Sequence, residues 1–181
     1  MERGMKPAYL SLGSNQGDRL HNLTLAIEGL EKFGVAALRS SVYETEPVDV
    51  MVETPAVETP AGATPLWFLN CAVVFHTPLS PLELLTESQA IERNLGRSTK
   101  GGKSPRPIDI DILLVGDFVV DSPVLTVPHP AMHRRRFVLE PLAEIAPFVF
   151  HPVLQQTVRD LLRAIPPQEQ IVRRYVTQYL S

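Results

Sequence analysis

Two aspartates, two positions apart, interrupt an apolar run in the middle of the chain. The stretch "SPRPIDIDILLVGD", residues 104–117, has the composition of a β-strand apart from Asp109 and Asp111. In a strand, residues i and i+2 point to the same face and lie about 6–7 Å apart. The two carboxylates therefore project together and repel each other unless a cation lies nearby. A solvent-facing strand edge is one explanation, and a site for a hard cation such as Mg²⁺, which prefers oxygen ligands, is the other.

Basic residues lie on both sides of this carboxylate pair. Arg97, Lys100, Lys103 and Arg106 precede it, and the run "HRRR" at 133–136 follows it. Each cluster alone is typical of a solvated surface. Together with the carboxylates they indicate phosphate handling, because cations and arginine forks spread the charge of a transferred phosphoryl group. The chain has neither a G-x-x-x-x-G-K-[ST] phosphate loop nor a G-x-G-x-x-G fingerprint, so it follows neither of those nucleotide-binding designs.

The spacing of apolar residues and the capping and turn residues between them predict the helices and strands that must position these residues. Apolar residues at helical spacing and a capping box at Ser80 predict two helices between β-like runs. The predicted order is strand, helix, strand, strand, helix, strand, which is an α+β, ferredoxin-like β-α-β-β-α-β antiparallel sheet with helices packed on one face. We expect these six elements near 8–14, 19–34, 35–45, 67–77, 81–95 and 108–115. Beyond them we expect a second strand up to residue 121, after a Gly-Asp turn, and short helices near 156–165 and 169–180.

Residues 48–66 differ from the rest of the chain. They contain the tandem repeat "VETPAVETPA", no aromatic residue and no long apolar run. Proline removes backbone donors and pushes its predecessor toward extended conformations. We therefore expect a flexible, proline-rich loop insertion within a single domain spanning residues 1–181.

The overall composition bounds the class of protein. A chain of 181 residues with 44% hydrophobic residues suits one globular domain, and a net charge of −3 gives no electrostatic footprint for nucleic acid. The single cysteine, Cys71, lies in the apolar run "FLNCAVVF" and fits a reducing compartment. No apolar stretch approaches the roughly 20 residues that span a bilayer. We expect a cytoplasmic protein that binds neither membrane nor nucleic acid.

Several motifs, in this order, resemble one enzyme family. "SLGSNQGDRLHNL", "PRPIDIDILLVGD" and "VPHPAMHRRRFVLEPLAEIAP" are similar to those of the 6-hydroxymethyl-7,8-dihydropterin pyrophosphokinase family, over roughly residues 8–165. The resemblance implies transfer of pyrophosphate from ATP to the hydroxymethyl group of the pterin, with release of AMP, in folate biosynthesis. It also implies that Asp109 and Asp111 hold two Mg²⁺ ions against the triphosphate. ATP and the pterin would be the only partners, and no protein partner would be required.

The resemblance further implies a set of site residues. Phe68 and Phe137 would sandwich the pterin ring, and Asn70 would hydrogen-bond to its polar edge, although core packing is the ordinary role of a single phenylalanine. The full pterin set is Thr45, Glu46, Val48, Phe68, Asn70 and Phe137. The nucleotide set is Gln89, Glu92, Arg97, Arg106, Ile112, Thr126, His129 and Arg135. The catalytic set is Arg97, Arg106, Asp109 and Asp111.

The loop that carries Arg97 departs from the family pattern, and two alternative functions of other classes remain open. The family often has a tryptophan between its two loop arginines, whereas the segment 98–105 has no aromatic residue. Ferredoxin-like sheets also include RNA-recognition domains, but their aromatic signature is missing here. An inactive relative that only senses metal or nucleotide is the second alternative, and the retained Asp109, Asp111 and Asn70 argue against it.

Overall fold

A computed structural model describes residues 4–47, 67–96 and 106–176 of the chain. Val48, Arg97 and the insertion 48–66 lie outside the described residues. The helices are α1 (Arg19–Leu30), α2 (Pro81–Asn94), α3 (Arg136–Ile145) and α4 (Val158–Arg163). The strands are β1 (Lys6–Ser14), β2 (Val35–Arg39), β3 (Tyr43–Thr45), β4 (Phe68–Thr77), β5 (Asp109–Val115), β6 (Val120–Asp121), β7 (Thr126–Val127), β8 (Phe150–His151), β9 (Gln156–Thr157) and β10 (Val172–Arg174).

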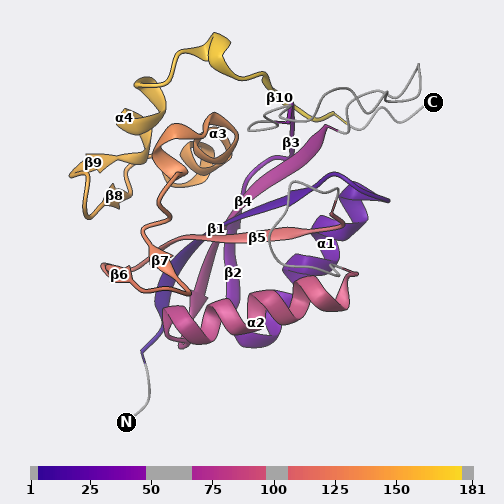
Figure 1. The fold of residues 1–181 in the computed structure, drawn as a ribbon, viewed down its shortest axis with the longest axis vertical. Coiled ribbons are helices and arrows are strands. Elements are labelled where there is room, and N and C mark those ends of the chain that lie inside the picture. Colours follow the sequence, from indigo (N-terminus) through magenta and orange to yellow (C-terminus); the bar gives the residue numbers. More distant parts are fainter. Residues whose placement is uncertain (1–3, 48–66, 97–105, 177–181) are drawn as a thin grey trace.

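One antiparallel sheet organises the molecule (Figure 1). Its strands follow the order β10-β3-β4-β1-β5, and β2 pairs with β4 beyond the end of β3. The central strand β1 pairs with β4 on one side and with β5 on the other. The elements β1, α1, β2, β4, α2 and β5 reproduce the predicted β-α-β-β-α-β order, so the ferredoxin-like fold class is confirmed.

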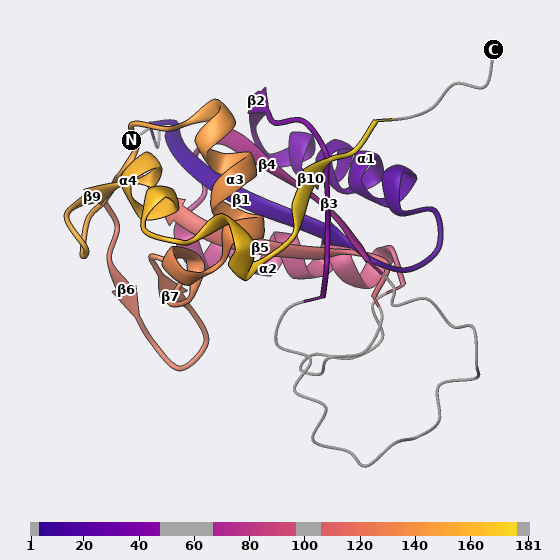
Figure 2. The ribbon, with the colours of Figure 1, turned by 90° about the horizontal axis from the view of Figure 1, so that it is seen from above.

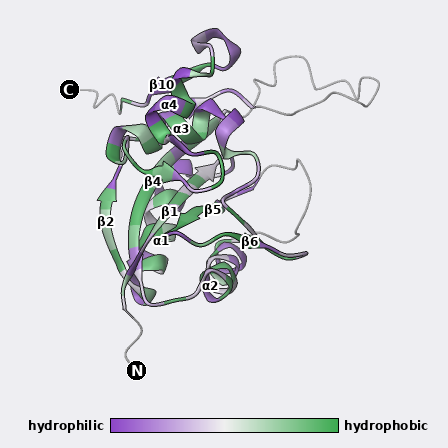
Figure 3. Ribbon diagram, turned by 90° about the vertical axis from the view of Figure 1, so that its left-hand side faces the viewer, coloured by the Kyte–Doolittle hydropathy of each residue, from purple (hydrophilic) through white to green (hydrophobic). Residues whose placement is uncertain are grey.

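Helices cover both faces of this sheet, whereas the sequence predicted helices on one face. Alternate residues of β4 explain the difference, because nearly the whole strand is buried. Leu69, Val73 and Phe75 belong to the core under α1 and α2, whereas Ala72 and Val74 pack into a second core with α3 and α4. Figure 3 shows the apolar strands between these two layers of helices. The second layer comes from the C-terminal third of the chain.

Local capping explains where two helices begin. Ser80 forms the predicted capping box of α2: its side chain accepts from the Glu83 backbone N–H, and the Glu83 carboxylate accepts from the Ser80 backbone N–H. Asp18 caps α1 by accepting from the backbone N–H of His21 at 3.0 Å. Helix α2 ends at Asn94, one residue before the predicted boundary, and α1 ends at Leu30 and passes into a 3-10 turn over Glu31–Phe33.

Three expectations about the elements are wrong in detail. The predicted strand 35–45 divides into β2 and β3 at Ser40, whose hydroxyl accepts from the Ala72 backbone N–H. The strand predicted after the Gly-Asp turn is only β6, and it pairs with β7 rather than with β5. Within the helix predicted over 169–180, residues 172–174 instead form strand β10, because the open edge of β3 supplies backbone partners that outweigh local helix propensity, and residues 177–180 lie outside the described part of the chain. The other C-terminal helix is confirmed as α4.

No helix in the described ranges is long and apolar enough to cross a membrane.

Candidate active site

The register of the sheet places a row of functional residues at one end of its strands. Gly13 of β1 lies opposite Asn70 of β4 on one side and opposite Asp109 of β5 on the other. Directly opposed residues in an antiparallel pair share a face, and neighbouring strands are about 4.8 Å apart. Asn70 and Asp109 are therefore about 10 Å apart on the face that α3 also covers. Ser11 lies opposite Asp111 on the same face.

Gly13 has no side chain, and the Asn70 amide lies against its backbone. A Cβ atom at this position would lie 2.6 Å from Oδ1 of Asn70, which is closer than real Cβ contacts allow. Asn70 is 3% exposed, and its Nδ2 donates to Oγ1 of Thr45 at 2.8 Å. The backbone of β1 thus forms the floor of the row, and a buried amide stands beside it.

The carboxylate pair lies as the sequence predicted. Asp109 and Asp111 are half-buried on the α3 face, whereas Ile110 and Ile112 are buried in the opposite core. Burial, together with the charge of Asp109, raises the pKa of Asp111 to about 7. Two carboxylates that disfavour each other's charge suit a hard cation, which relieves the repulsion and prefers oxygen ligands. Over the described ranges no three His, Cys, Asp or Glu side chains gather as a metal cage, so phosphate or water oxygens would complete the coordination.

Arg106 is fixed at both ends beside this pair. Its Nη1 donates to Oδ2 of Asp109 at 3.0 Å. Its backbone N–H donates to Oδ1 of Asn15 at 2.8 Å, and its carbonyl accepts from the backbone N–H of Asn15 at 3.3 Å. Asn15 is 7% exposed and was given no role from the sequence. An asparagine in a glycine turn that directly follows a strand was the only available signal.

Glu92 and Gln89 come from α2, which runs along the edge strand β5. Oε1 of the buried Glu92 accepts from the backbone N–H of Ile110 at 2.8 Å, between the two aspartates. Gln89 lies half-buried one turn earlier on the helix. Glu92 therefore anchors β5 through its backbone, and its contact with nucleotide stays a prediction.

His129 and Arg135 stand on the segment after β7. The backbone N–H of His129 donates to the Leu113 carbonyl at 2.9 Å, which ties this segment to β5. Its Nδ1 accepts from the Ala131 backbone N–H at 3.2 Å, so the neutral ring carries its proton on Nε2. Burial, together with the charge of Arg135, lowers the pKa of His129 to about 4. His129 is thus a neutral donor at pH 7.

Thr126 lies nearby, on β7, in the wall of a hollow of about 280 Å³ that His129 also lines. This hollow lies between the β6–β7 and β8–β9 hairpins, and most of its other lining side chains are apolar.

The predicted pterin residues come from three elements. Thr45 lies opposite Phe68 in the β3–β4 pairing, next to the Asn70–Thr45 hydrogen bond. Phe137 is half-buried in the first turn of α3, and the guanidinium of Arg135 lies 5.7 Å from the centre of its ring.

Glu46, the residue after β3, is held by the C-terminal segment, because its Oε1 accepts from the Ile171 backbone N–H at 2.7 Å. The structure thus brings the β3 and β4 residues together at one end of the sheet, and α3 packs across β4.

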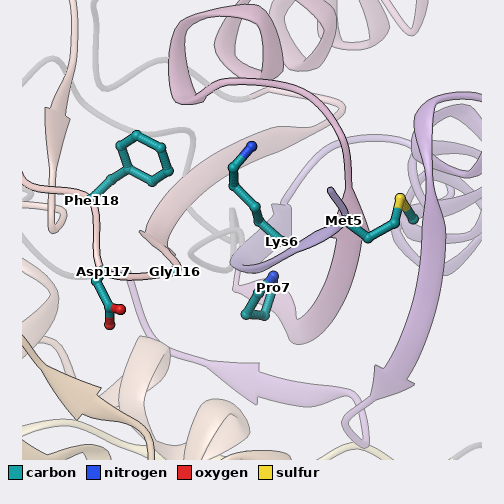
Figure 4. Close-up of a pocket in the computed structure, with 6 residues that line it drawn as sticks. All are labelled: Met5, Lys6, Pro7, Gly116, Asp117 and Phe118. Carbon is teal, nitrogen blue, oxygen red and sulfur yellow. The ribbon is translucent and has the colours of Figure 1, made fainter. Parts of the chain in front are cut away.

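A second hollow, of about 460 Å³, lies at the opposite end of β1 and β5 (Figure 4). Met5, Pro7 and Gly116 line it, and Lys6 lies 5.8 Å from the centre of the Phe118 ring. Seven positions of β1 separate Lys6 from Gly13, which is about 23 Å of strand. This hollow is therefore remote from the row of polar residues.

Comparison with known proteins gives consistent similarities. The model of the 7,8-dihydro-6-hydroxymethylpterin-pyrophosphokinase (HPPK) family matches residues 9–147. The 2-amino-4-hydroxy-6-hydroxymethyldihydropteridine pyrophosphokinase of Aquifex aeolicus is 38% identical over 86% of this chain and 90% of its own length. The enzyme of the same name from Bacillus subtilis is 41% identical over 76% of this chain and 77% of its own length.

Longer proteins match as well. The folic acid synthesis protein fol1 of Schizosaccharomyces pombe is 39% identical, and the match covers 90% of this chain but only 21% of fol1. Among solved structures, Plasmodium falciparum HPPK-DHPS with pterin and p-hydroxybenzoate has a TM-score of 0.68 at 21% identity. That match covers 91% of this chain and 42% of the Plasmodium chain, and it shows the fold alone.

Proposed function

The chain belongs to the 7,8-dihydro-6-hydroxymethylpterin pyrophosphokinase family, and we propose that the row from Asn70 to Asp111 is where it transfers pyrophosphate from ATP to the pterin. The observation that carries this assignment is the placement of Asn70 and Asp109 on either side of Gly13. An amide for a heterocycle and a carboxylate pair for a metal-bound triphosphate then share one face. Asn70 and Asp109 stand about 10 Å apart, one on each strand that flanks β1, so both substrates would meet over β1.

Asp109 and Asp111 would hold two Mg²⁺ ions, for which their oxygen chemistry and mutual repulsion are suited. When bound, the ions supply positive charge that neutralises the phosphate oxygens of the transferred and departing groups. Arg106, which Asp109 and Asn15 hold at the rim of the pair, would contact the same phosphate oxygens from the side. Arg97 belongs to the proposed clamp and lies outside the described residues.

The remaining residues orient the two substrates. The neutral His129 would donate from Nε2 to a phosphate oxygen, and the permanently charged Arg135 would lie beside it. Phe68 and Phe137 would stack on the pterin, and Asn70 would hydrogen-bond to its edge. The pterin hydroxyl then attacks the β-phosphorus, and the bond to the oxygen bridging the α- and β-phosphorus atoms breaks to release AMP. We assign no general base, because phosphoryl transfer depends mainly on positioning and charge neutralisation.

We also propose that this chain works in the cytoplasm and needs no fused second enzyme. The Aquifex aeolicus relative carries the pyrophosphokinase name alone, and 90% of its length is matched. The fol1 protein and the Plasmodium HPPK-DHPS are longer chains in which the matched part is one segment.

The test is to mix the protein with ATP, Mg²⁺ and 6-hydroxymethyl-7,8-dihydropterin and to identify the nucleotide product. We expect AMP together with a pterin diphosphate, and no turnover after Mg²⁺ is chelated. ADP in place of AMP would refute pyrophosphoryl transfer. ATP binding without any turnover would instead favour an inactive, sensing relative.

The metal assignment has its own variants. Asp111→Ala should abolish turnover while the thermal midpoint changes little, because it removes one of two repelling carboxylates. Asp117→Ala, an exposed aspartate just beyond the other end of β5, is the matched control and should keep full activity. Near-normal turnover by Asp111→Ala would contradict the assignment.

A further inference from the structure

The N-terminal turn of α3 is capped by a residue from the far end of the chain. The first backbone N–H groups of any helix have no partner within it. Arg135, the residue before α3, supplies no side-chain hydrogen bond to them. The N–H of Phe137 instead donates to Oε1 of Gln170 at 3.0 Å. Gln170 thus takes the role that a neighbouring Ser, Thr or Asp plays at other helices.

Only the oxygen of the Gln170 side-chain amide is hydrogen-bonded within the described residues. The side chain is 4% exposed, so water does not reach it freely. Its Nε2 has no hydrogen-bond partner in the described part of the chain. A buried donor without a partner is unfavourable, so packing alone does not account for a glutamine here. The paired Oε1 is the half of the amide that has a function.

The residues after Gln170 attach the same segment to the opposite wall of the site. The backbone N–H of Ile171 donates to Oε1 of Glu46, and its carbonyl accepts from the Glu46 backbone N–H. Val172 then pairs with Thr45 as β10 joins the sheet (Figure 2). Residues 170–172 therefore connect the start of α3 to the end of β3, and both ends carry proposed pterin residues.

We propose that Gln170 is a positioning residue for this site. By capping the Phe137 N–H it fixes where α3 begins, and so the place of the Phe137 ring and of the adjacent Arg135 guanidinium. Gln170 contacts neither substrate and acts through these two residues. This inference rests on the proposed function, in which Phe137 stacks on the pterin and Arg135 contacts ATP.

Three variants isolate the acceptor. Gln170→Met keeps the length of the side chain and removes the oxygen. Gln170→Glu keeps an acceptor and adds a negative charge at a helix N-terminus, where such charge is favourable. Gln168→Met makes the same change as the first variant two residues earlier, at an exposed position.

The expected result separates binding from folding. Gln170→Met should raise the KM for the pterin by about tenfold, which is below the roughly hundredfold effect that a misplacement of 1 Å can have. Gln170→Glu and Gln168→Met should stay within about threefold of the unmodified enzyme. Hydrogen exchange should show lost protection of the Phe137 amide in Gln170→Met alone. The fluorescence of Trp67, whose ring lies 4.6 Å from the Arg173 guanidinium of β10, checks that β10 is still docked.

Some outcomes would overturn the inference. A lower thermal midpoint of Gln170→Met with unchanged kinetic constants would leave Gln170 a merely structural residue. Unchanged protection of the Phe137 amide would remove the cap itself. If Gln170→Met does not fold, Gln170→Glu decides: a pterin KM within threefold supports the role of the oxygen, and a tenfold rise refutes it. Absence of AMP from the unmodified enzyme would defeat the proposed function, whereas the exchange measurement would still decide the cap.

Discussion

Replacing Gly13 by alanine tests the floor of the site with a single methyl group. The new Cβ would lie 2.6 Å from Oδ1 of Asn70, so the amide must move. Asn70 is buried, and its other end is tied to Thr45, so movement breaks or bends that hydrogen bond. We expect Gly13→Ala to lose both stability and affinity for the pterin, although alanine is otherwise acceptable in a strand.

The size of the effect follows from three opposing contributions. Overpacking a filled site costs about 1–3 kcal/mol. Loss of the Asn70–Thr45 hydrogen bond adds about 1 kcal/mol. Alanine returns about 0.5–1 kcal/mol, because glycine loses more backbone freedom on folding. The net loss in the free energy of unfolding should be about 1–3.5 kcal/mol. The displaced Asn70 amide would also lose about one hydrogen bond to the pterin, roughly 1 kcal/mol, which corresponds to about a fivefold rise in the Kd for the pterin.

A double-mutant cycle assigns the effect to Asn70. Urea unfolding gives the stability of Gly13→Ala, Asn70→Ala and the double variant, and calorimetric titration with the pterin gives affinity. If the methyl group acts through the amide, Gly13→Ala should have little effect on stability in the Asn70→Ala background, with a coupling of about 1–3 kcal/mol. Gly4→Ala, which places its Cβ in open space, is the matched control. Equal destabilisation in both backgrounds, or unchanged pterin affinity of Gly13→Ala, would refute the reasoning.

Two further predictions concern groups around β5. Glu92→Leu should lower the free energy of unfolding, measured in urea, by about 1–3 kcal/mol, because the buried Ile110 N–H loses its acceptor. Glu92→Gln keeps an acceptor and should lose less stability. Equal losses by the two variants would contradict this role of Glu92. The pKa of His129 is lowered to about 4 in the folded protein. Between about pH 6.5 and pH 4 the unfolded chain therefore binds a proton at this residue that the folded protein does not bind. Stability should therefore fall as pH drops from about 6.5 to 4, by up to roughly 3 kcal/mol from this residue. The raised pKa of Asp111 changes stability with pH in the opposite direction. The measurement is therefore the difference in unfolding free energy between the unmodified protein and His129→Gln at each pH. If the two proteins lose stability in parallel as the pH falls, His129 makes no contribution.

The parts of the site that lie on single strands were predictable from the sequence. The two-residue period of a strand was enough to place Asp109 and Asp111 together, opposite Ile110 and Ile112. The capping box at Ser80 likewise fixed the start of α2 from four consecutive residues. Such features depend on interactions within a few positions, and sequence patterns describe those well.

Features that depend on pairing between distant segments were not predictable in this way. Asn15 and Arg106 are 91 positions apart and exchange hydrogen bonds, and Gln170 reaches Phe137 across 33 positions. Segment 172–174 was predicted as helix, but the free edge of β3 makes it a strand. In each case the partner is chosen by the tertiary fold, and no local period or turn signal records it.

The edge strand β5 shows how such distant contacts make a binding surface. An open edge exposes unpaired backbone groups and is usually covered. The Ile110 N–H donates to the Glu92 carboxylate, and the Leu113 carbonyl accepts from the backbone N–H of His129. Ile112 lies between these two covers, and in an antiparallel ladder its backbone faces the same way as that of Ile110. Because its side chain is buried in the helix-side core, Ile112 can contact a nucleotide only through this backbone, so Ile112→Val should leave the KM for ATP unchanged. A large rise in that KM would place the side chain, rather than the backbone, against the nucleotide.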